Sequence, residues 1–383
     1  MSRIRSFSLL AAFLLLGSQP LFASSFAVGS CRPSLKSYPT ISAAVAAVPA
    51  GSTVLVCPGT YAEQVTIAQP LNLRGVSDGN SDQAIITGFG SMLANITTLG
   101  GAQLAAQILV TAGPVNISNL IIDGSGNSLN GFPNLAGIYY GSGASGEISH
   151  VTTRNQINNG FGMGIWAENG DSTNDAVSIR YCSIHDFDNT GILTNANVTA
   201  TLKYNYVSIT NYGGYTYGIA FFATGGAVGG NEVSGPGSTA AVVGQGITVL
   251  DPAITVGDNH ITNWYFGIVD FGGSSYVSNS VRETTSGIDL SGSGATLQSN
   301  SVTRSMIGIE FGCNQGTVQQ NQVVEANVGM DQVPSGLSST NTLFNVATIQ
   351  TAGCKPPAAA AVRAMNAGTT TLLKPHKFPR TSN

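Results

Sequence analysis

A repeated glycine constrains the fold of this chain more than any other feature. A Gly followed by Ile or Met recurs at spacings of 27, 27, 27, 28, 21, 20, 21 and 21 residues. The repeated positions are Gly137, Gly164, Gly191, Gly218, Gly246, Gly267, Gly287, Gly308 and Gly329. A period near 21 with two short β-rich pieces is too short for a propeller blade and lacks the leucine pattern of a horseshoe. The repeat predicts an all-β chain folded as a right-handed parallel β-helix solenoid, with the residue after each Gly stacked inside.

A second ladder consists of small polar residues, mostly Asn, two positions before an aliphatic residue. Its members are Ser118, Ser149, Cys182, Asn205, Asn231, Asn259, Asn279, Asn300, Asn321 and Asn341. From Asn259 onward the ladder steps by 20, 21, 21 and 20 residues, in phase with the glycines. Stacked amides at a turn form hydrogen-bonded ladders. We therefore expect these side chains to stack at one turn, with Cys182 buried among them.

Composition agrees with a solenoid of short strands. Only 9% of the residues are charged while 48 are Gly, which favours strands and tight turns and nearly excludes long helices. One short helix is predicted, because apolar residues from Ile41 to Val48 fall on one face between Pro39 and Pro49. This helix would cap the apolar end of the first coil.

The N-terminus is typical of an export signal. Arg3 and Arg5 precede an apolar stretch from Phe7 to Leu16, and small residues offer cleavage points after Ala23 or Ala27. We expect a signal peptide at residues 1–27, a β-helix domain at 28–354, and a secreted protein, extracellular or periplasmic. A second interpretation is a lipoprotein acylated at Cys31. No later run is long and apolar enough to span a bilayer.

Export makes disulfides possible for the five cysteines. We expect Cys31 to bond Cys57, tying the N-terminal segment to the first strand, and Cys313 to bond Cys354. Cys182 then remains as a buried free thiol. Nothing spaces these residues as a zinc site.

Charge is unevenly distributed along the chain. Residues 24–354 hold eight Lys or Arg against nineteen Asp or Glu, a balance of −11. Residues 355–383 hold five basic residues and no acid, and their Pro/Ala-rich composition predicts a disordered tail. An acidic body argues against a nucleic acid partner. We expect a monomer.

The N-terminal part resembles a known family. The run Tyr38-Pro39-Thr40-Ile41, the segment from Cys57 to Val65 and Leu73-Arg74-Gly75 are similar to the first coil of β-helix proteins of the pectin-lyase-like superfamily. The resemblance covers roughly residues 38–350 and implies the fold. It does not imply one activity, because the superfamily includes lyases, hydrolases, esterases, epimerases, tailspikes and adhesins.

Known pectinase motifs are incomplete in this chain. Gly59-Thr60-Tyr61-Ala62-Glu63 and Val269-Asp270-Phe271-Gly272 resemble segments of pectin methylesterases, but their Arg-Pro-Trp segment has no counterpart. The polygalacturonase acid set is missing. Arg282 and Arg304, which could resemble a pectate lyase base, follow the Asn ladder on a different strand from the candidate acids.

Three acids fall in one predicted column. The residue two positions after each ladder Gly should point outward, and in successive repeats this position holds Asp289, Glu310 and Asp331. Carboxylates about 5 Å apart repel, so either one pKa rises or a cation such as Ca²⁺ binds between them. We expect them to be a catalytic acid/base set or a Ca²⁺ site. Ordinary solvated strand positions are the alternative.

The same column is aromatic in the earlier, longer repeats, whose extra residues should form loops on one side. Aromatic faces beside acids and amides suit sugar binding. The candidate substrate-binding residues are Tyr139, Tyr140, Trp166, Tyr212, Tyr215 and Tyr217, with Phe221 and Phe222 beside them. Further catalytic candidates, or ordinary turn residues, are His185, Asp186 and Asp188.

Two functions in different classes remain open. One is a secreted polysaccharide-binding or polysaccharide-processing protein, a lyase or glycoside hydrolase if it is an enzyme. The other is a non-catalytic cell-surface or adhesion solenoid. An acid, base and cation site assembled across neighbouring coils would favour the first.

Overall fold

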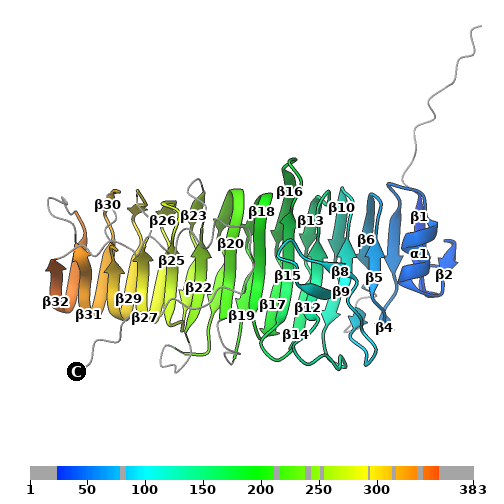
Figure 1. The fold of residues 1–383 in the computed structure, drawn as a ribbon, viewed down its shortest axis with the longest axis horizontal. Coiled ribbons are helices and arrows are strands. Elements are labelled where there is room, and N and C mark those ends of the chain that lie inside the picture. The colour runs from blue at the N-terminus through cyan, green and yellow to red at the C-terminus, as the bar shows by residue number, and fades with distance from the viewer. Residues whose placement is uncertain are drawn as a thin grey trace, which may run out of the picture.

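The protein is a single elongated solenoid (Figure 1), seen here in a computed structural model. The structure describes residues 24–77, 83–210, 216–237, 243–250, 254–291, 294–312, 316–333 and 340–352. Strands pair in parallel from coil to coil, and the one antiparallel pair of strands in these ranges is β8 with β9. The predicted parallel β-helix is confirmed.

Each coil has three sides, which we call the first, second and third faces in chain order. The first face begins with β1 (Ser25–Val28), β3 (Thr53–Val56), β6 (Leu71–Gly75), β10 (Val115–Ser118), β13 (Gly146–Ser149) and β16 (Asp175–Arg180), and continues with β23 (Thr255–Gly257), β26 (Ser275–Val277), β28 (Thr296–Gln298) and β30 (Val318–Gln319). The second face has β4 (Gly59–Ala62), β7 (Ala84–Thr87), β11 (Ile121–Asp123), β14 (Thr152–Gln156), β17 (Ser183–Phe187), β19 (Tyr206–Ser208), β21 (Glu232–Ser234) and β24 (His260–Thr262).

The third face has β5 (Val65–Ile67), β9 (Gln103–Val110), β12 (Asn134–Tyr140), β15 (Gly162–Asn169), β22 (Gly244–Val249) and β25 (Phe266–Asp270). Longer strands bend around a corner and serve two faces. Those that run from the third face into the first are β18 (Thr190–Lys203) and β20 (Thr216–Gly229). Those that run from the second face into the third are β27 (Ser280–Leu290), β29 (Ser301–Glu310), β31 (Gln322–Val333) and β32 (Thr342–Ala352). Outside the faces lie β2 (Ser37–Tyr38) and β8 (Ile96–Thr97).

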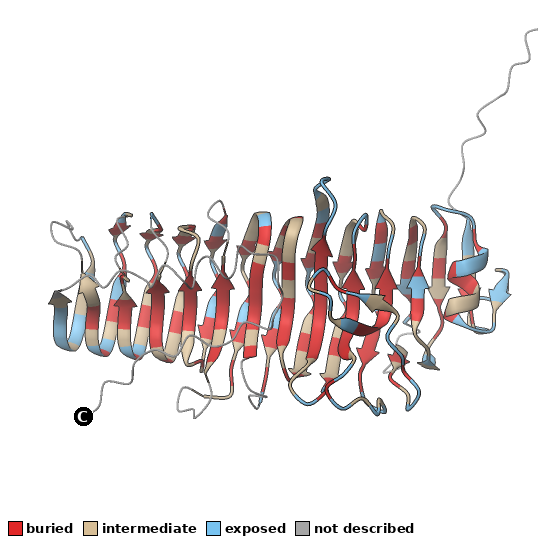
Figure 2. Cartoon of the chain, viewed as in Figure 1, coloured by how far each residue is buried: buried red, intermediate tan, exposed pale blue. Residues whose placement is uncertain are grey.

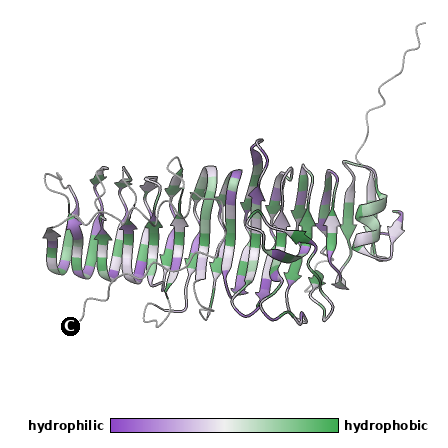
Figure 3. Cartoon of the chain, viewed as in Figure 1, coloured by the Kyte–Doolittle hydropathy of each residue, from purple (hydrophilic) through white to green (hydrophobic). Residues whose placement is uncertain are grey.

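The residues after the ladder glycines form the predicted inner stack. Strand register pairs each with its counterpart in the next coil, and each is at most 2% exposed. The stack is Ile138, Ile165, Ile192, Ile219, Ile247, Ile268, Ile288, Ile309 and Met330, and Ile108 and Val65 extend it toward the N-terminus. Buried bands therefore cross the coils from β3 to β31 (Figure 2), and they coincide with hydrophobic strand segments (Figure 3).

The glycine requirement has a steric cause. A Cβ placed on Gly287 would lie 2.5 Å from the carbonyl oxygen of Gly308 and 2.4 Å from Val302 Cγ1. The same contact, at 2.5–2.8 Å, joins every ladder Gly from Gly137 to Gly308 to the carbonyl of its successor. At this corner the backbones of consecutive coils are too close for any side chain, so only Gly fits.

The asparagine ladder forms the corner between the first and second faces. Asn259 donates its backbone N–H and its Nδ2 to Asn279 Oδ1 at 3.1 and 2.9 Å, and its Nδ2 also donates to the carbonyl of Val228. The side-chain bond repeats from each amide to the next along Asn205, Asn231, Asn259, Asn279, Asn300, Asn321 and Asn341. The first six are at most 2% exposed, so these amides meet their hydrogen-bonding needs inside the solenoid.

A left-handed residue makes that corner turn. The position before each ladder residue has positive φ, between 53° and 65°, in coil after coil. These residues are Asn119, His150, Tyr181, Tyr204, Gly230, Asp258, Ser278, Ser299 and Gln320. Because such a residue points its side chain away from the core, this position forms an exposed edge along the solenoid.

Cys182 occupies the ladder position as predicted and is a buried free thiol, whose backbone N–H donates to Asn205 Oδ1. Burial raises the pKa of this thiol to about 12, so it stays uncharged. The placement of Ser118 and Ser149 in the ladder is wrong. Ser149 pairs with Arg180, two residues before Cys182, so Leu120 and Val151 fill the ladder position in these coils. There apolar packing replaces the amides.

The N-terminal segment also follows the prediction in part. Helix α1 (Ile41–Ala47) lies at the N-terminal end of the solenoid (Figure 1), and Thr40 caps it by accepting from Ala43. Ser25 pairs with Thr53 and Ala27 is fully buried, so residues 25–28 form a strand of the first coil. Of the two expected cleavage points, only the one after Ala23 leaves β1 intact.

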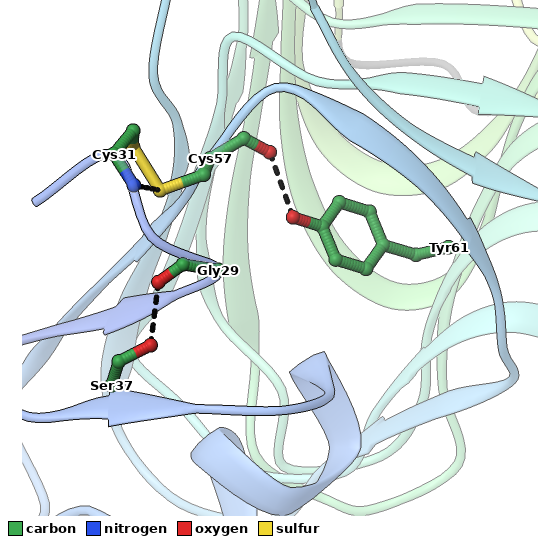
Figure 4. Close-up of a disulfide and its surroundings, with 5 residues drawn as sticks. All are labelled: Gly29, Cys31, Ser37, Cys57 and Tyr61. Carbon is green, nitrogen blue, oxygen red and sulfur yellow. Dashed lines mark hydrogen bonds between the residues drawn. A yellow bond between two sulfur atoms is a disulfide. The ribbon is translucent and has the colours of Figure 1, made fainter.

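Cys31 and Cys57 form the predicted disulfide (Figure 4). Cys31 is therefore not free for acylation, and the lipoprotein interpretation is wrong for this structure. The hydroxyl of Tyr61 donates to the carbonyl of Cys57 beside the disulfide. Cys313, Cys354, residues 1–23 and the basic tail from 355 lie outside the described residues, so the predictions made for them stay predictions. No helix in the described part of the chain is long and apolar enough to cross a membrane.

We predict that Asn279→Ala destabilises the solenoid by about 2–6 kcal/mol, because two buried donors of Asn259 lose their acceptor at about 1–3 kcal/mol each. Urea unfolding measures the change. Cys182→Asn is the matched substitution: the N–H of Val151 already bonds the sulfur, and an amide oxygen can accept it. It should leave stability unchanged or higher, and equal losses in the two variants would contradict the ladder's role.

We also predict that Gly287→Ala costs roughly 1–3 kcal/mol or more through overpacking against the next coil. Gly225→Ala is the control, since a Cβ there meets nothing closer than 3.9 Å. Thermal melts of both variants provide the comparison. A Gly287→Ala protein as stable as the control would show that the coils can separate at this corner.

Candidate functional site

The outward column of the third face contains the residues predicted for a binding surface. Register pairs Tyr139 with Trp166, then continues through Leu193, Ala220, Thr248 and Val269 to Asp289, Glu310 and Asp331. The predicted column is thus confirmed in its order. The column is less exposed than its outward direction suggests, since Tyr139, Trp166 and Asp289 are only 2%, 4% and 4% exposed.

A hairpin covers the aromatic end of this column. β8 pairs antiparallel with the start of β9, and Ile96 and Leu104 pack into one apolar cluster with Tyr139 and Trp166. The two rings meet edge to face, with centroids 5.6 Å apart. They form a covered apolar platform instead of an open one.

Two neighbouring aromatic residues are not surface residues. Tyr140 is 1% exposed, points into the core and donates its hydroxyl to the carbonyl of Val115, so its predicted role in substrate binding is wrong. Phe221 is likewise fully buried in the core. Strand alternation explains both, because each follows an outward residue. Tyr212 and Tyr215 lie outside the described residues, whereas Tyr217 lies on the third face, paired with Thr190 and Gln245.

Glu168, which the sequence analysis missed, is the chemically distinctive group on this face. It lies two residues after Trp166, hence on the same outward side, and is 1% exposed. Its Oε1 accepts from the hydroxyl of Tyr139 at 2.6 Å and from the N–H of Leu99 at 2.8 Å. Its Oε2 accepts only a long bond of 3.4 Å from Asn195. Extending the column by one further outward position would have found it.

Burial controls the protonation of this pair. Desolvation raises the pKa of Glu168, and hydrogen bonding from Tyr139, Leu99, Asn195 and Trp166 opposes that rise only in part. Desolvation and the nearby Glu168 raise the pKa of Tyr139 as well. A carboxyl of this kind can keep a proton at a pH where ordinary glutamates have lost it, which is the property of a general acid.

The acidic end of the column shows the predicted repulsion. Burial and then the charge of Glu310 raise the pKa of Asp289 to about 7, while the pKa of Glu310 is raised by burial and by Asp331. Ser291 donates to Asp289, Gln332 donates to Glu310, and the hydroxyl of Thr351 donates to Asp331. Each of the three carboxyls therefore accepts a hydrogen bond from an uncharged side chain.

Within the described ranges, no group of three or more His, Cys, Asp and Glu side chains is arranged to hold a metal ion. The three acids therefore form a stacked column, which is not a preformed cage. Protonation and Ca²⁺ binding at Asp289, Glu310 and Asp331 both stay predictions.

The turn candidates divide by role. Asp188 is 7% exposed and accepts three backbone N–H groups, from Asn158, Gly160 and Gly162 at 2.6–2.8 Å. It is buried and holds a turn, so the structure gives it a structural role in place of the predicted catalytic one. His185 Nδ1 and Asp186 Oδ2 lie 2.7 Å apart on the half-exposed end of β17, on the second face. This pair does not join the acids of the third face.

The residues that resembled pectin methylesterase motifs have structural roles. Glu63 accepts the N–H groups of Ile41 and Ser42 at the start of α1. Asp270 points inward, is fully buried and accepts from Gly273, Ser274 and the hydroxyl of Tyr276. Neither acid faces a substrate surface.

Comparison with solved structures identifies the fold class as the right-handed parallel β-helix. The GH136 lacto-N-biosidase from Eubacterium ramulus matches with a TM-score of 0.51 and 12% identity, over 84% of this chain and 65% of that chain.

Two further similar structures show lower TM-scores. The Dettilon tailspike protein matches with a TM-score of 0.47 and 12% identity, over 78% of this chain and 62% of its own. The A-module of mannuronan C-5 epimerase AlgE6 from Azotobacter vinelandii matches with a TM-score of 0.45 and 15% identity, over 83% and 91%. This chain spans less than two thirds of the tailspike and lacto-N-biosidase chains. No known protein-family pattern and no curated protein matches the sequence.

We predict that the acidic column makes stability fall as pH rises from about 4 to 7. The unfolded carboxyl of Asp289 has a pKa of about 3.9, and the folded one about 7. Folding therefore takes up a proton in this window, and above pH 7 the full penalty of burying the charge applies. Asp289→Asn should raise the melting temperature at pH 8 and change it little at pH 4, with about 1.4 kcal/mol for each unit of pKa elevation.

Thermal scans of the wild type, Asp289→Asn and the exposed control Glu325→Gln at both pH values measure this. Identical pH profiles in all three would contradict a protonated Asp289. The same scans with Ca²⁺ and with a chelator test the cation prediction. A melting temperature raised by Ca²⁺ in the wild type and not in Glu310→Gln would support it.

Proposed function

We propose that this protein is a secreted polysaccharide-processing β-helix protein that acts at the covered end of the third face. The observation that carries the proposal is Glu168, a buried carboxyl with a raised pKa, hydrogen-bonded to Tyr139 among aromatic side chains. A residue whose pKa is perturbed by burial and by a specific partner marks a functional site more often than an ordinary surface acid does.

The two oxygens of Glu168 have different surroundings, which suits proton transfer. Oε1 receives two short hydrogen bonds and is held in place, while Oε2 has only the long bond from Asn195. A proton on Glu168 therefore belongs on Oε2, the oxygen free to donate it. From there it can protonate the leaving oxygen of a glycosidic bond as hydrolysis or elimination requires.

Aromatic side chains near this carboxyl would supply apolar surface for sugar rings once the hairpin that covers them moves. Trp166 and Tyr139 lie in the same outward column as Leu193, one coil further on. Sugars combine apolar ring faces with hydroxyl edges, and aromatic residues beside amides and carboxyls match both. The Cys31–Cys57 disulfide supports export, because disulfides persist outside the cytosol.

Access to Glu168 depends on the turn between β8 and β9. Leu99 covers the carboxyl with its backbone and is itself 43% exposed. The turn is closed by a bond between Gly101 and Thr98, and Thr98 also accepts the N–H of Ala102. Substrate would reach Glu168 when this turn moves outward and gives up one hydrogen bond to the carboxylate.

A second candidate is the non-catalytic surface solenoid. The observation in its favour is the same burial, since a carboxyl that accepts Leu99 N–H and Tyr139 hydroxyl can also serve only to fasten the hairpin to the third face. The two functions differ in what Glu168→Gln does to activity and to stability.

We expect the wild type to cleave one member of a panel of acidic and neutral polysaccharides, tested with and without Ca²⁺ by assays of reducing ends and unsaturated ends. Glu168→Gln should lower the rate by about 10²–10⁴-fold, the usual contribution of a general acid. Glu325→Gln is the matched control on a remote exposed acid, and melting curves verify folding of each variant. Absence of cleavage across the panel, with Glu168→Gln changing only stability, would support the non-catalytic solenoid.

A further inference from the structure

The corner between the first and second faces carries a second surface, away from Glu168. At the left-handed position of three successive coils, the rings of His150, Tyr181 and Tyr204 stack face to face. Their centroids are 5.3 Å apart in both pairs, with interplanar angles of 21° and 15°. Tyr181 and Tyr204 are nevertheless 50% and 55% exposed. We call these three residues the corner stack.

The geometry of the corner stack determines what it offers a ligand. Each ring face is used by its neighbour, and the ring of Tyr204 lies over Gly230, where a Cβ would come within 2.6 Å of it. The exposed parts are therefore ring edges and tyrosine hydroxyls, repeated once per coil. At the N-terminal end of the stack, the ring face of His150 that Tyr181 does not cover adjoins open space.

That open space is a cleft of about 450 Å³, lined by Arg32, Arg74, Asn119, His150 and Thr152 among others. The cleft joins the first coils at the same corner, so it continues the line of the corner stack. Its walls supply two guanidinium groups, two amides, two hydroxyls and one imidazole. These groups bind anions and hydroxyls.

Cations flank the corner stack along its length. Register places Arg74, Ser118, Ser149, Arg180 and Lys203 in one column on successive coils, directly before the left-handed position. Arg180 pairs with Glu147. Arg74 and Lys203 are exposed and take part in no ion pair among the described residues.

The distribution of charge in the whole domain makes this corner distinctive. Residues 24–354 contain eight basic residues. Arg154, Arg180, Arg282 and Arg304 form ion pairs, and Lys36 lies over the ring of Tyr38. The three that remain, Arg32, Arg74 and Lys203, are exposed and all lie at this corner. In a domain with a balance of −11, every basic residue without such a partner among the described residues is next to the corner stack or its cleft.

We propose that the cleft and the corner stack bind an acidic polysaccharide chain made of uronic acid residues. The basic residues would pair with its carboxylates, the tyrosine hydroxyls and serines with its hydroxyls, and His150 with a ring face. Both the ligand and the corner repeat along one axis, so consecutive sugars meet consecutive coils, which are about 4.8 Å apart. This surface is separate from the third face and does not rest on the function proposed for Glu168.

The test is calorimetric titration of the full-length protein with a short oligogalacturonate and with its fully methyl-esterified counterpart, which has the same backbone without charge. We expect the acid to bind at least about tenfold more tightly, and its affinity to fall as salt is added. Inorganic phosphate at equal charge should compete poorly. Equal binding of acid and ester, equal competition by phosphate, or absence of binding would each overturn the proposal.

Variants locate the site. Arg74→Gln should weaken binding by about tenfold, the value of a hydrogen bond between charged groups, and Tyr181→Phe should weaken it several-fold by removing a hydroxyl while keeping the stack. Arg304→Gln is the charge-matched control at a remote corner and should bind as the wild type does. Glu168→Gln should also bind normally, which separates this outcome from the test of the proposed function. Normal binding by both Arg74→Gln and Tyr181→Phe would refute the location.

Discussion

The buried amide-to-amide hydrogen bond between consecutive coils is the interaction on which the rest of the structure depends. Asn231, Asn259 and Asn279 each accept from the coil before and donate to the coil after, so no coil can slide against its neighbours without breaking these bonds. A slip by one residue would turn every outward side chain inward. The ladder thereby fixes the register of the coils from Asn205 to Asn341, whereas the apolar side chains of Leu120 and Val151 fill the same position in earlier coils.

The repeat allowed much of the fold to be predicted, and the failures have a physical origin. Ladder glycines and the residues after them were found because steric exclusion permits only one residue type at that corner. The amide ladder was predicted wrongly at Ser118 and Ser149, because the first coils fill the same position with Leu120 and Val151. The position requires only a buried side chain, and amide or aliphatic groups satisfy that equally well. A pattern of polar letters could not reveal the substitution.

The sequence predicted which side chains of the candidate site point outward, but it did not predict how deeply they are buried. Strand alternation identifies Tyr139, Trp166 and Asp289 as outward, and they are. Their burial comes from the hairpin of β8 and β9 in the aromatic part, a local insertion whose packing no periodicity encodes. Glu168 was missed because its distinguishing property is the contact with Leu99, 69 residues away in the sequence. Asp188 was overvalued for the opposite reason, since three backbone N–H groups of its own turn bind its carboxylate.

Electrostatics gives the two surfaces different relations to an approaching chain. A strongly acidic domain repels a polyuronate over most of its surface, and the exposed basic residues at one corner provide a surface that attracts such a chain. Protonation of Glu168 on the third face reduces this repulsion, because a neutral carboxyl carries no charge that repels the polymer. Protonation also avoids the free-energy cost of burying a charged carboxylate. Under both proposals, the corner binds the charged chain, and Glu168 contacts a sugar only after the Leu99 turn has opened. Binding and catalysis then depend on different residues, so salt and pH affect them differently.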